Sequence, residues 1–199
     1  MMTSKRVLAA LALAALPAAS AFAQSAQQDV NLTANVAQFC KFNTVNLPGG
    51  SLVNMSVVSS STSSSVLQVA NPINTTTGTL NAASFQMTLA SACNSQSRVV
   101  LTTQNGGMTP GVAPVVDPGS SAAFATKINY TATAFWNGLS VAAIATDGST
   151  PAGFTSTGNT IAGPRTGPVT VFFNIDSSPT TIVAAGTYAD TLTVRLEPQ

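Results

Sequence analysis

The sequence predicts an all-β protein folded as an antiparallel sandwich. Apolar and polar residues alternate with a period of two over several short segments, as they do in strands that bury one face. Val and Thr, which favour strands, are abundant, whereas the helix formers Glu, Lys and Arg are rare beyond residue 6. Polar turns separate the segments and no helical crossover lies between them, a pattern typical of antiparallel sandwiches.

The first half of the chain contains four of the expected strands. The first covers 29–36 and places Val30, Leu32, Ala34 and Val36 on one face. If the same alternation continues beyond residue 36, Cys40 lies on that face as well. Short strands are expected at 52–58 and 66–69, on either side of a Ser/Thr-rich run. A longer strand ends at Cys93. The residues that share the strand face of this cysteine are Phe85, Met87, Leu89 and Ser91.

The second half continues the pattern. Strands are expected at 98–103, 127–136, 169–175 and 187–196, and turn-rich loops at 105–121 and 146–168. The last strand places Tyr188, Leu192, Val194 and Leu196 on one side, where Asp190 interrupts the apolar series. No repeat or domain boundary is visible, so residues 24–199 are expected to form a single domain.

The N-terminus has the three parts of a secretory signal peptide. Lys5 and Arg6 precede an uncharged apolar run at 7–16, and Ala21-Phe22-Ala23 supplies small residues at a cleavage site. The alternative, a transmembrane anchor, needs about 20 apolar residues, and this run is shorter. We therefore expect residues 1–23 to be removed and the chain to be exported, with Gln24 as its first mature residue.

Charge and cysteine content narrow the class of protein further. Without Lys5 and Arg6, five basic side chains remain against six acidic ones, so no basic patch is available to bind nucleic acid. Cys40 and Cys93 are the two cysteines of the chain, and in an oxidising compartment we expect them to form one disulfide bond. Two free thiols are the alternative.

Nothing in the sequence indicates an enzyme. The chain has no His, which excludes catalytic triads built on His and zinc sites built on imidazole. Three acids, Asp117, Asp147 and Asp176, begin turn-like pairs, where Asp normally caps its own backbone. A pair of carboxylates acting on glycosidic bonds is the alternative. We expect no catalytic residue, no metal site and no cofactor.

The aromatic residues near the middle of the chain allow two interpretations. Tyr130, Phe135 and Trp136 lie close together in the sequence and could form a platform for a sugar ring. A single Trp on an alternating strand is more often a core residue, and we expect Trp136 to be buried.

Four segments together resemble the spore coat protein U family, which includes pilin subunits of archaic chaperone–usher pili. They are 29–36 followed by Cys40, 90–93 (ASAC), 128–132 (INYTA) with Trp136 behind it, and 185–194 (AGTYADTLTV). The last of these is the most specific match. The four segments span well under half of the mature chain, and the loops between them carry no resemblance.

The resemblance implies an immunoglobulin-like sandwich that lacks one strand. A periplasmic chaperone would fill the open groove first, and the N-terminal strand of the next subunit, within 24–37, would then replace it in the fibre. Val30, Leu32, Ala34 and Val36 would be the inserted side chains of that donor strand, by β-augmentation. The partners would be other pilin subunits, the chaperone and an outer-membrane usher, and the protein would pass through the periplasm to the cell surface.

A second function class stays open. The chain could be a self-contained secreted or surface domain with a binding or matrix role, whose first strand pairs within its own sheet. A carbohydrate-binding module is a further alternative.

Overall fold

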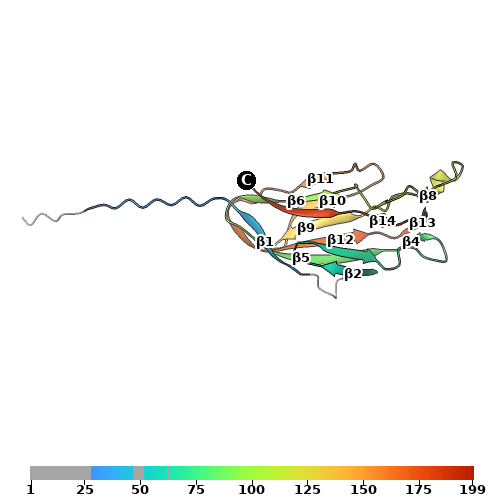
Figure 1. The fold of residues 1–199 in the computed structure, drawn as a ribbon, viewed down its shortest axis with the longest axis horizontal. Helices are drawn as coiled ribbons and strands as arrows, with labels where there is room; N and C mark the ends of the chain where they lie inside the picture. The colour runs from blue at the N-terminus through green and yellow to red at the C-terminus, as the bar shows by residue number, and fades with distance from the viewer. Residues whose placement is uncertain (1–27, 47–51, 62) are drawn as a thin grey trace, which may run out of the picture. The chain divides into compact units, whose positions relative to one another are not determined.

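The computed structural model describes residues 28–46, 52–61 and 63–199, and the signal peptide expected at 1–23 lies outside this part. The chain divides between Val36 and Ala37 into two units. We call the second unit, residues 37–199, the body. Figure 1 shows its strands running mostly along one direction.

Strands make up nearly all regular structure of the described residues. They are β1 Cys40–Asn46, β2 Met55–Ser60, β3 Ser65–Val69, β4 Thr79–Leu80, β5 Ala83–Cys93, β6 Ser97–Thr103, β7 Thr109–Pro110, β8 Phe124–Ala125, β9 Thr131–Trp136, β10 Leu139–Ala145, β11 Thr155–Thr157, β12 Arg165–Ile175, β13 Ser178–Val183, β14 Tyr188–Ala189 and β15 Leu192–Pro198. The helical structure described is one 3₁₀ turn, Ser121–Ala123. Within the described part of the chain, no helix is long and apolar enough to cross a bilayer.

The strands form several sheets with mainly antiparallel pairing. The largest has the order β1-β5-β12-β9-β10, and a second has the order β11-β6-β15. Three smaller sheets pair β4-β13-β8, β14-β7 and β2-β3, and the contact between β13 and β8 is parallel. Figure 1 shows β4, β8, β13 and β14 gathered at one end of the body. The all-β, antiparallel fold class is therefore confirmed.

The hydrophobic core takes side chains from both larger sheets. On β12, Val169 and Val171 are fully buried, and they alternate with exposed or half-buried neighbours. Val99 and Leu101 of β6 are also at 0% exposure. The members of the core on β5, β9 and β12 include Phe85, Leu89, Ala132, Ala134, Trp136, Phe173 and Ile175. Burial of these side chains is the main stabilising contribution that the sequence pattern provides.

Large and small side chains complement each other in this core. Phe173 lies directly opposite Ala132 of β9, which leaves space for its ring. That ring stacks on Phe85 at 4.9 Å and lies 4.7 Å from the ring of Tyr130. Ser91, the polar residue on the inner side of β5, is buried because its hydroxyl donates to the carbonyl oxygen of Gly167 at 2.6 Å.

The alternation predicted for the strand before Cys93 and for 127–136 is confirmed. β5 buries Phe85, Leu89, Ser91 and Cys93 and half-buries Met87. Alternate residues from Ile128 to Trp136 are all buried, although β9 itself begins at Thr131. The strands expected at 66–69, 98–103 and 169–175 are present as β3, β6 and the end of β12.

Three of the expected strands differ in the structure. Residues 28–39 form no strand, so the one expected at 29–36 is absent. The strand expected at 52–58 begins later, at Met55. The strand expected at 187–196 is split into β14 and β15, which pair with different strands. In addition, β12 begins at Arg165 and β11 lies at 155–157, inside the loop expected at 146–168.

β10 is a strand that the alternation did not predict. It is rich in Ala, and its burial follows no clear period of two. The preceding residues, Asn137 and Gly138, have φ of 48° and 80° and connect β9 to β10 as a two-residue loop. Asn-Gly is the usual sequence of such a hairpin turn, so this local signal indicated a strand after Trp136.

Candidate functional site

One side of the body is closed by main-chain hydrogen bonds. The N–H of Gly158 donates to the carbonyl oxygen of Val99 on β6 at 2.9 Å. The N–H of Asn159 donates to the carbonyl oxygen of Val141 on β10 at 3.0 Å. These two bonds join the edge strand of the five-stranded sheet to the three-stranded sheet. A Cβ at position 158 would overlap the carbonyl oxygen of Val141, so the two backbones meet here as closely as a glycine permits.

The other side of the body has no such closure among the described residues. β1 is the last strand of the five-stranded sheet, and β15 is the last strand of the three-stranded sheet. Each has one paired edge, β1 to β5 and β15 to β6, and its second edge has no strand partner in the described part of the chain. Such an edge offers unpaired N–H and C=O groups to any further strand.

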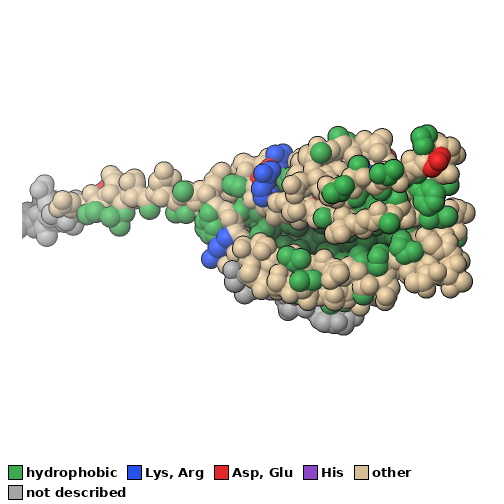
Figure 2. All heavy atoms as spheres, turned by 45° about the vertical axis from the view of Figure 1, so that its right-hand side comes forward, with side chains coloured by type: hydrophobic (Ala, Val, Ile, Leu, Met, Phe, Trp, Pro, Cys, Tyr) green, Lys and Arg blue, Asp and Glu red, His purple; other side chains and the backbone are tan. Residues whose placement is uncertain are grey.

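A groove lies on this open side. Figure 2 shows the body hollowed along an elongated groove whose floor is lined with hydrophobic side chains. In height it lies between β15, drawn in red in Figure 1, and the β2–β3 hairpin, drawn there in teal. Both elements carry half-buried apolar side chains packed against the core, namely Leu192, Val194 and Leu196 on β15 and Met55, Leu67 and Val69 on the hairpin. The apolar layer is therefore incompletely covered here.

The hairpin that bounds the groove is attached beside β5. Val53 and Ser84 exchange two backbone hydrogen bonds, of 2.9 and 3.0 Å. Asn54, with φ of 52°, donates its side-chain amide to the carbonyl oxygens of Asn71 and Ala82, both at 2.9 Å. Its side-chain oxygen accepts the N–H of Asn71. The base of the hairpin is thus held by the backbone pairing of Val53 with Ser84 and by the side chain of Asn54.

The predicted disulfide is confirmed. Cys40 and Cys93 are bonded and lie directly opposite each other on β1 and β5. Cys93 is 3% exposed and belongs to the core. The bond therefore fixes the start of the edge strand β1 to the end of its neighbour β5.

The C-terminal residues predicted to share one strand face do not all do so. Leu192, Val194 and Leu196 share the inner face of β15, as expected. Tyr188 lies on β14 instead, opposite Pro110, and its hydroxyl donates to the carbonyl oxygen of Ala184 at 2.8 Å. Desolvation by burial raises the pKa of Tyr188 above its usual value.

Asp190 explains the interruption between the two strands. Its carboxylate accepts hydrogen bonds from the hydroxyls of Tyr130 and Thr103 and from the backbone N–H groups of Asn105 and Gly107. A side chain with these four partners cannot continue the apolar series of a strand. The residue that broke the sequence pattern is therefore an anchor that sets where β15 begins.

The predicted donor residues lie outside any sheet. Val30, Leu32 and Val36 are 73%, 90% and 75% exposed, and Ala34 is exposed as well. No secondary structure covers them. Val30, Leu32 and Val36 are therefore large apolar side chains without cover in the described structure. Together with Ala34 they occupy every second position of the segment.

The other candidate sites of the sequence have structural roles. Trp136 and Tyr130 are 0% and 3% exposed, so the core interpretation of these aromatic residues is confirmed and a sugar platform on their faces is excluded. Phe135 packs edge-to-face against Phe172 at 5.5 Å. Asp117 accepts the N–H of Gly119 within its own turn.

Asp147 has the same kind of role. Its carboxylate accepts hydrogen bonds from Ser149 and Thr150. These bonds hold the pKa of the Asp147 carboxyl below its usual value, and the bond from the Ser149 hydroxyl contributes most. Turn chemistry at these Asp positions is as predicted.

Two features of the site were not predicted from the sequence. The closure at Gly158 lies in the loop expected at 146–168, and the role of the hairpin as a wall of the groove requires knowing which sheets it adjoins. Among the described residues, no three His, Cys, Asp or Glu side chains are placed to hold a metal ion. Comparisons of the chain with protein-family models, with curated proteins and with solved structures give no match.

Proposed function

We propose that the protein is a structural subunit of a cell-surface fibre, and that the body is an immunoglobulin-like sandwich lacking one strand. The missing strand would come from the N-terminal segment of another copy of the chain. The observation that carries the proposal is the unpaired edge of β15 beside the hydrophobic groove. An added strand would pair with this edge and cover the half-buried Leu192, Val194 and Leu196.

The N-terminal segment has the properties of such a strand. Val30, Leu32, Ala34 and Val36 alternate with the polar residues Asn31, Thr33 and Asn35, so a strand formed by 30–36 has one apolar face. Full burial of a Val or Leu contributes roughly 1.5–3 kcal/mol, which for three such residues gives on the order of 5–9 kcal/mol before ordering costs. We propose that this strand inserts into another copy of the chain and does not pair within its own sheet.

Other partners follow from the same proposal. A groove with an open edge and an apolar floor is an aggregation hazard until a strand fills it. A periplasmic chaperone would protect the groove before assembly, and an outer-membrane usher would exchange it for the next subunit. The protein would then reside at the cell surface, after export through the periplasm.

A matched pair of substitutions tests the donor role. Leu32→Asp places a carboxylate on the apolar face of the segment, and Thr33→Asp places the same charge on its polar face. We expect Leu32→Asp to prevent fibre formation because the charge would be desolvated in the groove, while Thr33→Asp assembles like the unmodified chain. Electron microscopy and the ladder of polymers on gels measure assembly.

The stability of the single chain separates the proposal from the alternative. Because the proposal places Leu32 in the groove of a partner and not in its own body, Leu32→Asp should leave the free energy of unfolding of the monomer unchanged. If this substitution unfolds the monomer, the segment packs in its own domain. The hypothesis of a self-contained secreted domain is then the better one. If both variants polymerise equally, the donor segment lies elsewhere.

A further inference from the structure

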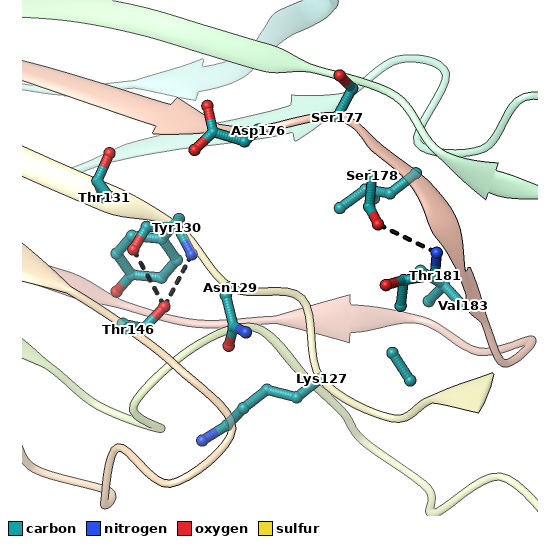
Figure 3. A pocket seen from close by; sticks show the side chains of 12 residues that line it. Lys127, Asn129, Tyr130, Thr131, Thr146, Asp176, Ser177, Ser178, Thr181 and Val183 are labelled. Carbon is teal, nitrogen blue, oxygen red and sulfur yellow. Dashed lines mark hydrogen bonds between the residues drawn. The ribbon is translucent and has the colours of Figure 1, made fainter. Parts of the chain in front are cut away.

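A second concave site lies at the end of the body where β4, β8 and β13 gather. Its volume is about 300 Å³, and it shares no lining residue with β15 or with the β2–β3 hairpin. Its walls come from β4, β8, β13, the turn between β12 and β13, and the segment before β9. In Figure 3 the side chains of Asn129 and Tyr130 lie on one side of the open space, and those of Ser178 and Thr181 lie across from them.

Polar side chains line much of this pocket. They include Lys127, Asn129, Thr131, Asp176, Ser177 and Thr181. Ser178 accepts the N–H of Thr181 at 3.0 Å and its hydroxyl keeps a proton to donate. The lining of this one small space thus includes hydroxyls, an amide and a carboxylate, which together offer both donors and acceptors.

The charges of the pocket disfavour an ionic ligand. The ammonium group of Lys127 donates to the carbonyl oxygen of Thr150 at 2.9 Å, which directs it to the chain's own backbone. One oxygen of Asp176 accepts from the side-chain amide of Asn174 at 2.6 Å. With one acid and one base in its lining, the site has no net charge with which to select an anion or a cation.

The walls are held in place without a ligand. The hydroxyl oxygen of Thr146 accepts the N–H of Tyr130 at 2.7 Å and donates to its carbonyl oxygen at 3.1 Å. Both residues are buried, so this contact fixes the segment that carries Asn129 and Thr131. A pre-formed site loses less free energy in ordering its side chains when it binds.

We propose that this pocket binds one ring of a neutral saccharide. A sugar ring carries several hydroxyl groups, each able to donate and accept, which matches the mixed amide, hydroxyl and carboxylate lining. The volume is at the lower end of the roughly 300–1,000 Å³ of ligand pockets, so it suits one ring better than a chain of rings. The half-buried Leu80 and Val183 supply an apolar surface for the C–H groups of that ring.

Saturation-transfer NMR on the full mature chain tests this, because the method works for a monomer and for a fibre alike. The probes are glucose, galactose, mannose and N-acetylglucosamine at millimolar concentration. We expect at least one of them to bind, and Asp176→Ala and Asn129→Ala each to weaken that binding at least tenfold. Both side chains are exposed, so neither substitution should unfold the body. Asp117→Ala, at an exposed turn away from the pocket lining, is the matched control and should bind as before.

Three results would overturn the proposal. They are no binding of any of the four sugars, binding that Asp176→Ala and Asn129→Ala leave unchanged, and equal weakening by Asp117→Ala. The proposal does not depend on the fibre: the Leu32→Asp chain should bind the same sugar, so a failure of assembly and a failure of sugar binding are separate results.

Discussion

The hydroxyl of Tyr130 donates a hydrogen bond of 2.8 Å to Oδ2 of Asp190. Tyr130 is 3% exposed and precedes β9, whereas Asp190 lies between β14 and β15, so the bond connects the large sheet to the start of the open edge strand. Desolvation by burial, together with the neighbouring Asp190 carboxylate, raises the pKa of Tyr130 well above its usual value. The hydroxyl therefore keeps its proton, and its role as donor, throughout the ordinary pH range.

Removal of the Asp190 carboxylate should destabilise the body strongly. Asp190→Ala leaves the buried hydroxyls of Tyr130 and Thr103 and the N–H groups of Asn105 and Gly107 without their acceptor. Each buried donor left unpaired costs about 1–3 kcal/mol, so we expect a total loss of about 3 kcal/mol or more. Tyr130→Phe, which removes one donor only, should cost about 1–2 kcal/mol. Urea unfolding measures both, and a loss for Asp190→Ala no greater than for the exposed Asp117→Ala would contradict the anchor role.

The closed side of the body depends on the absence of a side chain at position 158. Gly158→Ala would place a Cβ 2.6 Å from the carbonyl oxygen of Val99 and in overlap with that of Val141. β6 and β10 would have to separate, and we expect a loss of about 1–3 kcal/mol. The control is Gly148→Ala, where a Cβ meets no atom within 4 Å. Equal melting temperatures for the two variants would show that the closure has no effect on stability.

The disulfide should stabilise the chain by constraining its unfolded state. Cys40 and Cys93 are separated by 53 positions, and closing a loop of this length contributes roughly 4 kcal/mol in the chain-entropy model. Reduction should therefore lower the unfolding free energy of the unmodified chain by about this amount. The double variant Cys40→Ala with Cys93→Ala should not respond to reductant. Mass measurement after alkylation without reductant checks the pairing itself, and two modified thiols would contradict it.

A weak pH dependence should come from the end of β15. Hydrogen bonds from Arg98, at 2.9 and 2.8 Å, and the nearby Arg195 hold the pKa of Glu197 below its usual value. Because the pKa is lower in the folded state, this contribution to stability is complete above the unfolded-state pKa and is lost as the pH falls through the folded-state value. The Glu197 side chain is 25% exposed, so we expect at most about 1 kcal/mol.

Glu197→Gln should remove this contribution. Its stability should differ from that of the unmodified chain near neutral pH and converge with it in acid. Thermal unfolding as a function of pH measures the difference, and two parallel pH profiles would rule out the contribution of this carboxylate.

The sequence determined those parts of the fold that depend on a local period of two. Strands with one largely buried face were predicted with the correct inner residues, as the alternate positions from Phe85 to Cys93 and from Val169 to Ile175 demonstrate. The disulfide was predicted as well, because a chain with two cysteines and an export signal allows only one intramolecular pair. Core placement of Trp136 followed from the same alternation.

The sequence could not distinguish a strand that pairs in its own sheet from one that does not. The alternation at Val30 to Val36 is as regular as that at Val169 to Ile175, yet the first segment is exposed and the second lies in the core. Alternation records which face of a strand is apolar, and it contains nothing about the partner that covers that face. The proposed donor role uses this same property.

Tertiary structure alone decided where the body is open and where it is closed. The closure needs Gly158 next to both Val99 and Val141, and the anchor needs Asp190 next to Tyr130 and Thr103. These partners are far apart in the sequence and come together only when the sheets form. The sequence marked Asp190 as an irregularity in a strand. Because its hydrogen-bond partners lie on other strands, only the folded chain could identify it as the residue that sets the start of the open edge.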